Sequence, residues 1–362
     1  MKIFTIVCLS VLVYNTAFAQ IQNIDSTKSF FLQPVEIKAI RVGDKMPFTK
    51  TNINKQTIAA QNFGQDLPFL FNQTPSVVIN ADAGTGIGYT GIRIRGTDAT
   101  RINVTLNGIP YNDAESQNVY FVDMPDVASS INSIQIQRGV GTSSNGAGAF
   151  GATINLSTNE FNDKPYAATY NTYGSFNTLK NTIKAGTGLI NHQFILDMRL
   201  STIKSNGFID RASSNLQSLY ISGVYINAHS SLRLNLLSGK EKTYQAWNGI
   251  PEARLKGDIQ GMKDFFKQNG YDAADSAHLF NSANRTYNYF TYNNQTDNYQ
   301  QNQYQLFFNH KWNSHTSFNV ATFFTRGLGY YEEYKKAQAF NNYGLSNYIM
   351  GTDTIKTTNL IR

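Results

Sequence analysis

The chain has 362 residues and a formal net charge of +7, and only 15% of its residues are charged, against roughly 25% in typical soluble proteins. Its 21 Tyr and 24 Phe, together with many uncharged polar residues, favour extended β-structure. The positive charge is spread along the chain without a dense Lys/Arg cluster, which argues against a nucleic-acid-binding protein.

A secretory signal peptide is expected at residues 1–19. An apolar run at 3–14 follows Lys2 and leads to an A-x-A cleavage site that ends at Ala19. The run is too short for a membrane helix, which needs about 20 apolar residues. Cleavage would remove Cys8, the only cysteine, so the mature chain should have no disulfide and no thiol chemistry.

Two different segments follow the signal peptide. Residues 20–45 are polar, with an extended stretch after Pro34 in which Val35 and Ile37 alternate with polar neighbours. Residues 46–158 form a compact mixed α/β segment, in which short helices and turns separate strands. The strands are expected in the stretches SVVI, IRIR, INVTL, SIQIQR and TINLS.

Two glycine-rich stretches in this segment match the pattern G-x-G-x-x-G, at 86–91 and 146–151. A dinucleotide site requires a helix directly after such a loop, because the helix N-terminus holds the pyrophosphate. Each stretch is instead followed by a predicted strand. Tight turns that need positive φ are therefore favoured over nucleotide binding.

From residue 159 the chain reads as a series of long antiparallel strands with two faces. Phe194, Leu196 and Met198 alternate with polar residues, a pattern over about ten residues that is typical of transmembrane β-barrels. Short turns alternate with longer links, and a soluble β-sandwich has no reason to sort its loops in this way. The longer links are expected at about 205–215, 244–300 and after 327.

About seven barrel strands are expected in residues 159–362. The long external loop near 244–300 should contain one short amphipathic helix, marked by Leu255, Ile259, Met262 and Phe266. The stretch TTNLIR at 357–362 is expected to begin an eighth strand.

Catalytic and metal-binding patterns are not found in this sequence. The five histidines show no metal-ligand spacing, and no paired carboxylates or Ser/His/Asp arrangement stands out. The chain is therefore not expected to be an enzyme or to need a cofactor. A secreted β-rich enzyme stays an alternative that would require a catalytic cluster.

At this point the chain resembles the TonB-dependent outer-membrane receptors. The resemblance covers roughly 100 residues, with its motifs in the family order. It rests on LPFLFNQTPSVVI from Leu67, the IRG stretch at 94–96, LNGIP at 106–110, IQIQRG at 134–139 and GAFGATINL at 148–156. Val140 and Ala152 stand where the family usually has Pro and Gly, which are mild departures.

The resemblance implies a mixed α/β plug domain at 46–158, followed by antiparallel transmembrane β-barrel strands at 159–362. In this family the plug fills a barrel of about 22 strands, whose lumen is wide enough to be plugged. Seven strands would leave two open edges, whose unpaired backbone groups are costly in lipid. The barrel is thus expected to be incomplete in this chain, which reads as the N-terminal portion of a longer receptor.

The resemblance also implies partners and a location. The protein should lie in the outer membrane of a Gram-negative bacterium, contact its lipid, and be inserted by the barrel assembly machinery. Val35, Glu36 and Ile37 are the expected TonB box, which would add as a strand to the TonB protein of the TonB-ExbB-ExbD complex. No folded extension fits between the cleavage site and this stretch.

A ligand would bind between the plug apices and the external loops, and the apices are expected at 82–89, 111–116 and 118–121. Aromatic area mixed with hydrogen-bonding groups suits a chelate or cofactor ligand. The candidate ligand-binding residues are Arg95, which belongs to the IRG motif and faces the inner wall, and Tyr111, Asn112, Asp113, Tyr120 and Trp247.

The expected function is energy-coupled uptake of a scarce ligand, and a ferric siderophore fits the family best. Cobalamin, haem or a small glycan stay open as ligands. A receptor that binds or signals without import is the alternative of a different class.

Overall fold

A computed structural model describes residues 41–43, 46–141 and 148–362. The predicted signal peptide, the candidate TonB box at Val35, Glu36 and Ile37, and part of the second glycine-rich stretch lie outside these residues. No helix among the described residues is long and apolar enough to cross a membrane.

The first described domain is built on a five-stranded sheet with the order β1-β6-β7-β4-β5. Strands β4 and β7 are parallel, and the other neighbours are antiparallel. The strands are β1 (Lys50–Asn54), β4 (Ile102–Leu106), β5 (Ile109–Pro110), β6 (Ser133–Arg138) and β7 (Ala152–Ser157). Strand β1 is at one edge of the sheet, and helix α2 (Lys55–Gln61) follows it directly.

A separate hairpin joins β2 (Val77–Ala81) and β3 (Thr90–Ile94). Two of the short helices expected between these strands are 3₁₀ turns, at Leu67–Phe71 and Val127–Ser129. The hairpin, the turns and the sheet bury one apolar core, which includes Phe71, Ile94, Leu106, Ile136 and Ile154. Burying each such side chain contributes roughly 1.5–3 kcal/mol, so this core holds the domain together.

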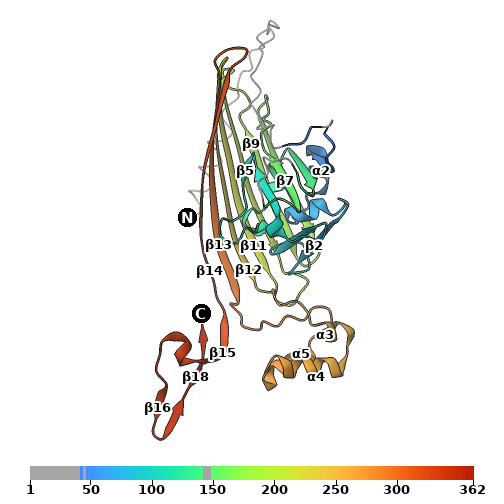
Figure 1. Ribbon diagram of the computed structural model, residues 1–362, viewed down its shortest axis with the longest axis vertical. Helices are drawn as coiled ribbons and strands as arrows, with labels where there is room; N and C mark the ends of the chain where they lie inside the picture. The colour runs from blue at the N-terminus through green and yellow to red at the C-terminus, as the bar shows by residue number, and fades with distance from the viewer. Residues whose placement is uncertain (1–40, 44–45, 142–147) are drawn as a thin grey trace, which may run out of the picture. The chain divides into compact units, whose positions relative to one another are not determined.

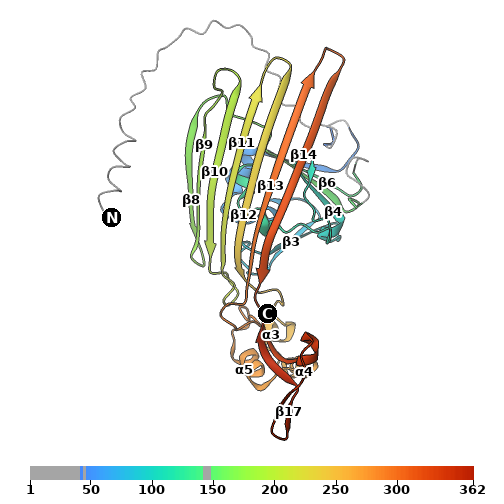
Figure 2. The ribbon, with the colours of Figure 1, turned by 90° about the vertical axis from the view of Figure 1, so that its left-hand side faces the viewer.

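The second part of the chain is a seven-stranded antiparallel sheet in which each strand pairs with the next in sequence. Figures 1 and 2 show the strands side by side, from β8 at one edge to β14 at the other. The strands are β8 (Tyr166–Gly174), β9 (Thr178–Gly186), β10 (Phe194–Ser205), β11 (Ser214–Ile226), β12 (Ser230–Tyr244), β13 (Thr296–Lys311) and β14 (Ser317–Tyr331). Because β8 and β14 do not pair, the barrel is incomplete in the described chain.

The two faces of this sheet differ in polarity, as the alternation predicts. The face toward the first domain, called here the inner face, carries polar residues such as Arg199, Asn235 and Gln305, all buried. The outer face carries exposed apolar residues such as Leu196 and Leu234. Since successive side chains of a strand point to opposite faces, an apolar outer and a polar inner face is the pattern of a membrane barrel wall.

The strand connections sort by length, with one exception. Links 187–193, 227–229 and 312–316 lie on one side of the sheet, called here the short-turn side. Links 206–213 and 245–295 lie on the other, the long-loop side, where the β8–β9 turn at 175–177 is the exception. Link 245–295 contains α3 (Glu252–Lys256), α4 (Ile259–Gln268) and α5 (Ala273–Asn281) (Figure 1).

The amphipathic helix expected in this link is divided in two: Leu255 belongs to α3, whereas Ile259, Met262 and Phe266 belong to α4. Gly257 adopts a left-handed conformation with φ +69° and ends α3, and the Asp258 side chain caps α4 by accepting a hydrogen bond from the Gly261 amide. Met262 is buried, whereas Leu255 and Ile259 are exposed. The four regularly spaced apolar residues thus belong to two helices, and their side chains do not form one buried face.

The C-terminal stretch also differs from the expectation. Residues 357–362 do not begin an eighth strand of the wall. They form β18 (Thr357–Ile361), which pairs with β15 (Tyr334–Ala339) in a two-stranded sheet. A further hairpin joins β16 (Tyr348–Met350) and β17 (Asp353–Ile355), so the chain after β14 folds on itself instead of extending the wall.

Candidate ligand-binding site

The loop between β2 and β3 reaches the long-loop side of the wall. The backbone oxygen of Ala83 accepts a hydrogen bond of 2.8 Å from the Phe208 amide, in link 206–213. Gly86, at φ +79°, is required for this turn, because a Cβ there would lie 2.7 Å from the ring of Phe69. The first glycine-rich stretch is therefore a tight apex loop, as the sequence predicts.

Three rings form an aromatic cluster at this apex: Tyr89, Trp247 and Tyr331. The Tyr89 and Trp247 centroids are 5.4 Å apart in an edge-to-face arrangement, and those of Trp247 and Tyr331 are 6.2 Å apart. Trp247 is 38% exposed, so part of its ring is available to a ligand. Edge-to-face pairs of this kind also stabilise the contact between apex and loop.

Three carboxylates lie beneath the aromatic cluster and form an acidic cluster: Asp123, Glu241 and Asp297. The Tyr89 hydroxyl donates a hydrogen bond to Asp297 of β13. Asp123 belongs to the first domain, and its backbone lies so close to β12 that a Cβ at Gly239 would collide with it. Glu241, two residues further along the inner face of β12, is only 2% exposed.

The acidic cluster has no Lys or Arg partner among the described residues. Burial, together with the nearby carboxylates of Asp297 and Asp113, raises the pKa of Asp123 to about 7. One oxygen of Glu241 accepts a long hydrogen bond of 3.4 Å from Thr243, and the other has no hydrogen-bond partner among the described residues. The Glu241 carboxyl group thus has an oxygen that can accept a hydrogen bond from a ligand.

Two of the sequence-predicted residues lie beside these clusters. Trp247 belongs to the aromatic cluster, and Tyr111 lines a small pocket together with Asp123 and Gly239. Gln301 of β13 donates a hydrogen bond of 2.6 Å to the Tyr111 hydroxyl.

Asn112 and Asp113 use their side chains within their own loop. Asn112 accepts from the Val104 amide at 2.8 Å and donates to the Ile102 oxygen at 2.9 Å, and one oxygen of Asp113 caps the turn that ends at Ser116. Tyr120 is 40% exposed.

Arg95 lies at the other end of β3 from Tyr89, which places it roughly 20 Å away at about 3.3 Å per residue. Its backbone has φ 53°, and its amide donates to the Ser76 oxygen. Its guanidinium lies against Gly139, the last residue of the IQIQRG stretch. The structure therefore does not bring Arg95 together with Tyr111 and Trp247.

Five residues of the two clusters are absent from the sequence-based candidates: Tyr89, Asp123, Glu241, Asp297 and Tyr331, although Tyr89 lies in the expected apex 82–89. Glu241 could have been found, because Gly239, Glu241 and Thr243 alternate with Lys240 and Lys242 and so share the inner face. Asp297 and Tyr331 are paired across β13 and β14, and this pairing needs the strand register.

A second acidic residue of the first domain is held by the wall itself. The carboxylate of Asp126 lies 2.7 Å from Lys180 and 3.8 Å from Arg199, and it accepts hydrogen bonds from Thr182 and Ser201. Burial alone would raise the pKa of Asp126, but Arg199 and Lys180 outweigh it and hold the pKa below its ordinary value. This group of residues, the Asp126 anchor, fastens the domain to β9 and β10.

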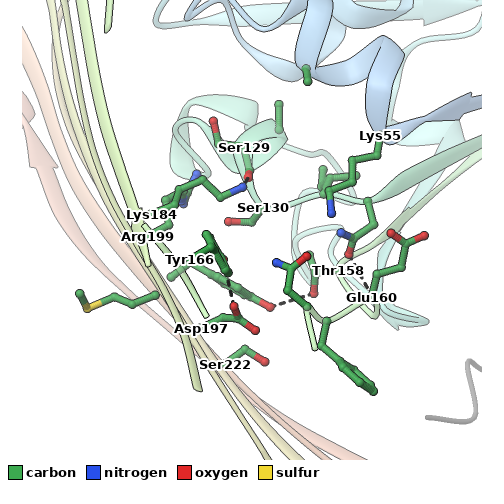
Figure 3. Close-up of a pocket in the computed structure, with 18 of the residues that line it drawn as sticks. Lys55, Ser129, Ser130, Thr158, Glu160, Tyr166, Lys184, Asp197, Arg199 and Ser222 are labelled. Atoms are coloured by element: carbon green, nitrogen blue, oxygen red, sulfur yellow. Dashed lines mark hydrogen bonds between the residues drawn. The ribbon is translucent and has the colours of Figure 1, made fainter. Parts of the chain in front are cut away.

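A polar cavity of about 150 Å³ opens beside the Asp126 anchor. Figure 3 shows Lys55 of α2 on one side and Tyr166, Lys184, Asp197 and Arg199 of the wall on the other. The Tyr166 hydroxyl donates to Asp197 at 2.9 Å. Tyr166 and Asp197 lie near the short-turn ends of their strands, so the cavity is on the opposite side of the domain from the aromatic cluster.

No metal centre is found among residues 41–43, 46–141 and 148–362, where no three His, Cys, Asp or Glu side chains are grouped to hold an ion. The described site is therefore one of rings, amides and carboxylates.

A mixed α/β domain packed against the polar inner face of an outward-apolar antiparallel sheet defines a plugged β-barrel. Residues 43–153 match the model of the TonB-dependent Receptor Plug Domain family. The match and the fold together show a plug domain of this family, followed by part of a barrel wall like that of the TonB-dependent receptors.

Solved structures of receptors share this fold at low sequence identity. The open form of the ferric-catecholate import receptor Fiu from E. coli K12 is 18% identical, with a TM-score of 0.60, and the alignment covers 80% of this chain and 40% of Fiu. P. aeruginosa FpvA bound to a pyoverdine-iron complex is 14% identical, with a TM-score of 0.57, and the alignment covers 78% of this chain and 34% of FpvA.

The ferric yersiniabactin uptake receptor FyuA from Yersinia pestis is 10% identical, with a TM-score of 0.56 and coverage of 79% of this chain and 42% of FyuA. The chain thus spans about two fifths of the length of these receptors. No curated protein sequence matches it.

Proposed function

We propose that this chain acts in an outer-membrane receptor that imports a scarce ligand by energy coupling to TonB, and that the ligand is a ferric siderophore. The observation that carries the proposal is a plug domain fastened to the polar inner face of a barrel wall, with an aromatic site on the long-loop side. The receptors of similar fold are named for import of a ferric catecholate, for a pyoverdine-iron complex and for uptake of ferric yersiniabactin.

The direction of transport follows from the two ends of the plug. The ligand binds at the aromatic cluster on the long-loop side, which faces outward. At the other end, the proposed contact with TonB is the candidate TonB box, Val35, Glu36 and Ile37, which would add as a strand to TonB. The cavity beside the Asp126 anchor is the first space that a displaced plug would open, because polar residues of plug and wall already line it.

The experiment is uptake of radioactive iron by iron-starved cells of the native host, supplied with a panel of ferric siderophores. We expect deletion of the gene to abolish uptake of at least one ferric chelate. Ile37→Pro, which removes a strand donor, should abolish uptake but leave binding to cells intact. Ile183→Val, on the outer face of β9, is the matched control and should transport normally.

The outcomes separate the alternatives. Binding without uptake in the native receptor would favour a receptor that only binds or signals. Normal uptake of every ferric chelate after deletion would contradict the iron proposal, and the same assay with labelled cobalamin, haem and small glycans would then identify another ligand.

A further inference from the structure

We propose that the acidic cluster of Asp123, Glu241 and Asp297, together with the rings of Tyr89 and Trp247, is a subsite for a cationic group of the imported ligand, an ammonium or a guanidinium. This inference rests on the proposed function, since it assigns a chemical class to the ligand of the same receptor. It predicts a ligand that carries a positive group and disfavours a purely polyanionic chelate.

The first support is the charge balance of the cluster. One carboxylate comes from the plug, one from β12 and one from β13, and none of the three forms an ion pair with a Lys or Arg of the described chain. Asp126 in the same plug segment is a fully paired acid by comparison, because two cations and three hydroxyls surround its carboxylate. The described chain therefore leaves room at these carboxylates for a positive group that it does not itself supply.

The second support is the unpartnered oxygen of Glu241. A buried carboxylate that lacks a partner is costly, so such groups normally have a cation or several donors. Glu241 is 98% buried, as its 2% exposure shows, and its side chain has only the distant Thr243 hydroxyl. This oxygen is therefore available to a donor that arrives with the ligand.

The third support is the aromatic cluster above the carboxylates. An ammonium or guanidinium is attracted to an aromatic face, and a carboxylate near the ring adds charge attraction. Tyr89 joins both parts, because its ring packs on Trp247 while its hydroxyl donates to Asp297. Tyr331 already receives a cation of this chain: the Arg362 guanidinium lies 5.8 Å from its ring centroid.

An inorganic metal ion fits this site less well than an organic cation. Among the described residues no three acidic or histidine side chains converge on one point, and a divalent ion needs about six oxygen ligands at 2.0–2.6 Å. An organic cation has several donors spread over a few ångströms, and it can use carboxylates that do not share one centre.

The test uses the purified native receptor and a small probe pair, phenethylammonium and its neutral analogue 2-phenylethanol. Binding is followed by calorimetric titration of the purified receptor, which needs no tryptophan reporter. We expect the ammonium to bind at least tenfold more tightly than the alcohol, and Glu241→Gln or Asp297→Asn to remove this preference. Glu252→Gln, at an exposed acid of α3, is the matched control and should keep it.

Equal affinity for the two probes, or an ammonium preference that survives in Glu241→Gln, would overturn the proposal. The comparison of the two probes on the unmodified receptor tests the proposal even if the variants fail to fold. This readout does not involve iron, so a failure of ferric uptake in cells is distinguishable from a failure of the subsite. For any ferric siderophore that the cells import, acetylation of its amine should lower affinity at least tenfold, and an unchanged affinity would contradict the assignment.

Discussion

Two acids three residues apart in the plug, Asp123 and Asp126, meet the barrel wall in opposite ways. Asp126 faces Lys180 and Arg199, and its charge is fully compensated. Asp123 faces Glu241 and Asp297, and its charge is not compensated. The comparison indicates that the wall has basic residues where it holds the plug, at Asp126. It has acidic residues where the plug faces the long-loop side, at Asp123. The following predictions test this contrast.

Removing the anchoring charge should have the largest effect. Asp126→Asn leaves Lys180 and Arg199 buried without a counter-charge, a situation that costs about 3–5 kcal/mol. We expect the plug of the purified receptor to be cleaved much faster by trypsin and to unfold at lower urea concentration. Asp98→Asn, at an exposed acid of the plug, should change neither measurement.

A double variant checks the cause of that effect. Asp126→Asn combined with Lys180→Met removes one of the stranded cations and should recover part of the lost stability. If Asp126→Asn leaves the plug as resistant as the native receptor, the anchor does not hold it.

The close approach of plug and wall at Gly239 gives the next effect. A side chain there would collide with the Asp123 backbone and lie 2.8 Å from Pro125, so Gly239→Ala should cost about 1–3 kcal/mol and loosen the plug near the acidic cluster. Urea unfolding of the receptor measures this. Gly223→Ala on β11 is the control, since its Cβ would meet nothing within 4 Å. Equal effects of the two variants would show that strand propensity, not contact with the plug, is responsible.

Glu241→Gln should have a smaller effect on stability, and of opposite sign to Asp126→Asn. It replaces a buried carboxyl group, one oxygen of which has no partner, so the ligand-free receptor should gain about 1 kcal/mol in unfolding free energy. The same urea titration detects it. A loss as large as that of Asp126→Asn would mean that Glu241 has a cationic partner after all, which would remove the contrast between the two regions.

The pH dependence of stability should give the smallest effect. Asp123 has a folded-state pKa of about 7, against about 3.9 unfolded, so the folded receptor binds more protons and gains stability as pH falls from about 7 toward 4. The melting temperature should therefore increase as the pH is lowered from 8 to 6, and Asp123→Asn should reduce this change of melting temperature with pH. The charged and titratable groups around Asp123 are Asp113, Asp297, Glu241, Tyr89, Tyr111 and Tyr299. An identical slope in Asp123→Asn would assign the titration to another of these groups.

The sequence predicts the fold well because each barrel strand carries its own two-residue alternation, and the plug motifs occur in family order. Leu196 and Arg199 could be assigned to opposite faces from their spacing alone. The amphipathic helix expected in the long link was not predicted correctly at its start. Gly257 ends α3 in a left-handed conformation, which apolar spacing does not reveal.

The site was harder to predict, because it depends on which plug residue meets which wall residue. Asp126 and Arg199 are far apart in the chain, and only the plug's seating on β10 brings them together. Asn112 and Asp113 have the right chemistry for a ligand, but a polar loop residue that caps its own turn looks the same in sequence as one that points to a ligand.

The position of β1 at the edge of the plug sheet has a mechanical consequence. The segment just before it is tied to β6 by side-chain contacts, for the Val42 amide donates to Gln135 at 2.7 Å. A force applied upstream of Val42 would break these contacts first. It would then separate the β1–β6 pairs one after another instead of all together. Such peeling would carry α2 and Lys55 away from the polar cavity while β6, β7 and β4 stay paired, so a weak pull can clear a path without melting the domain.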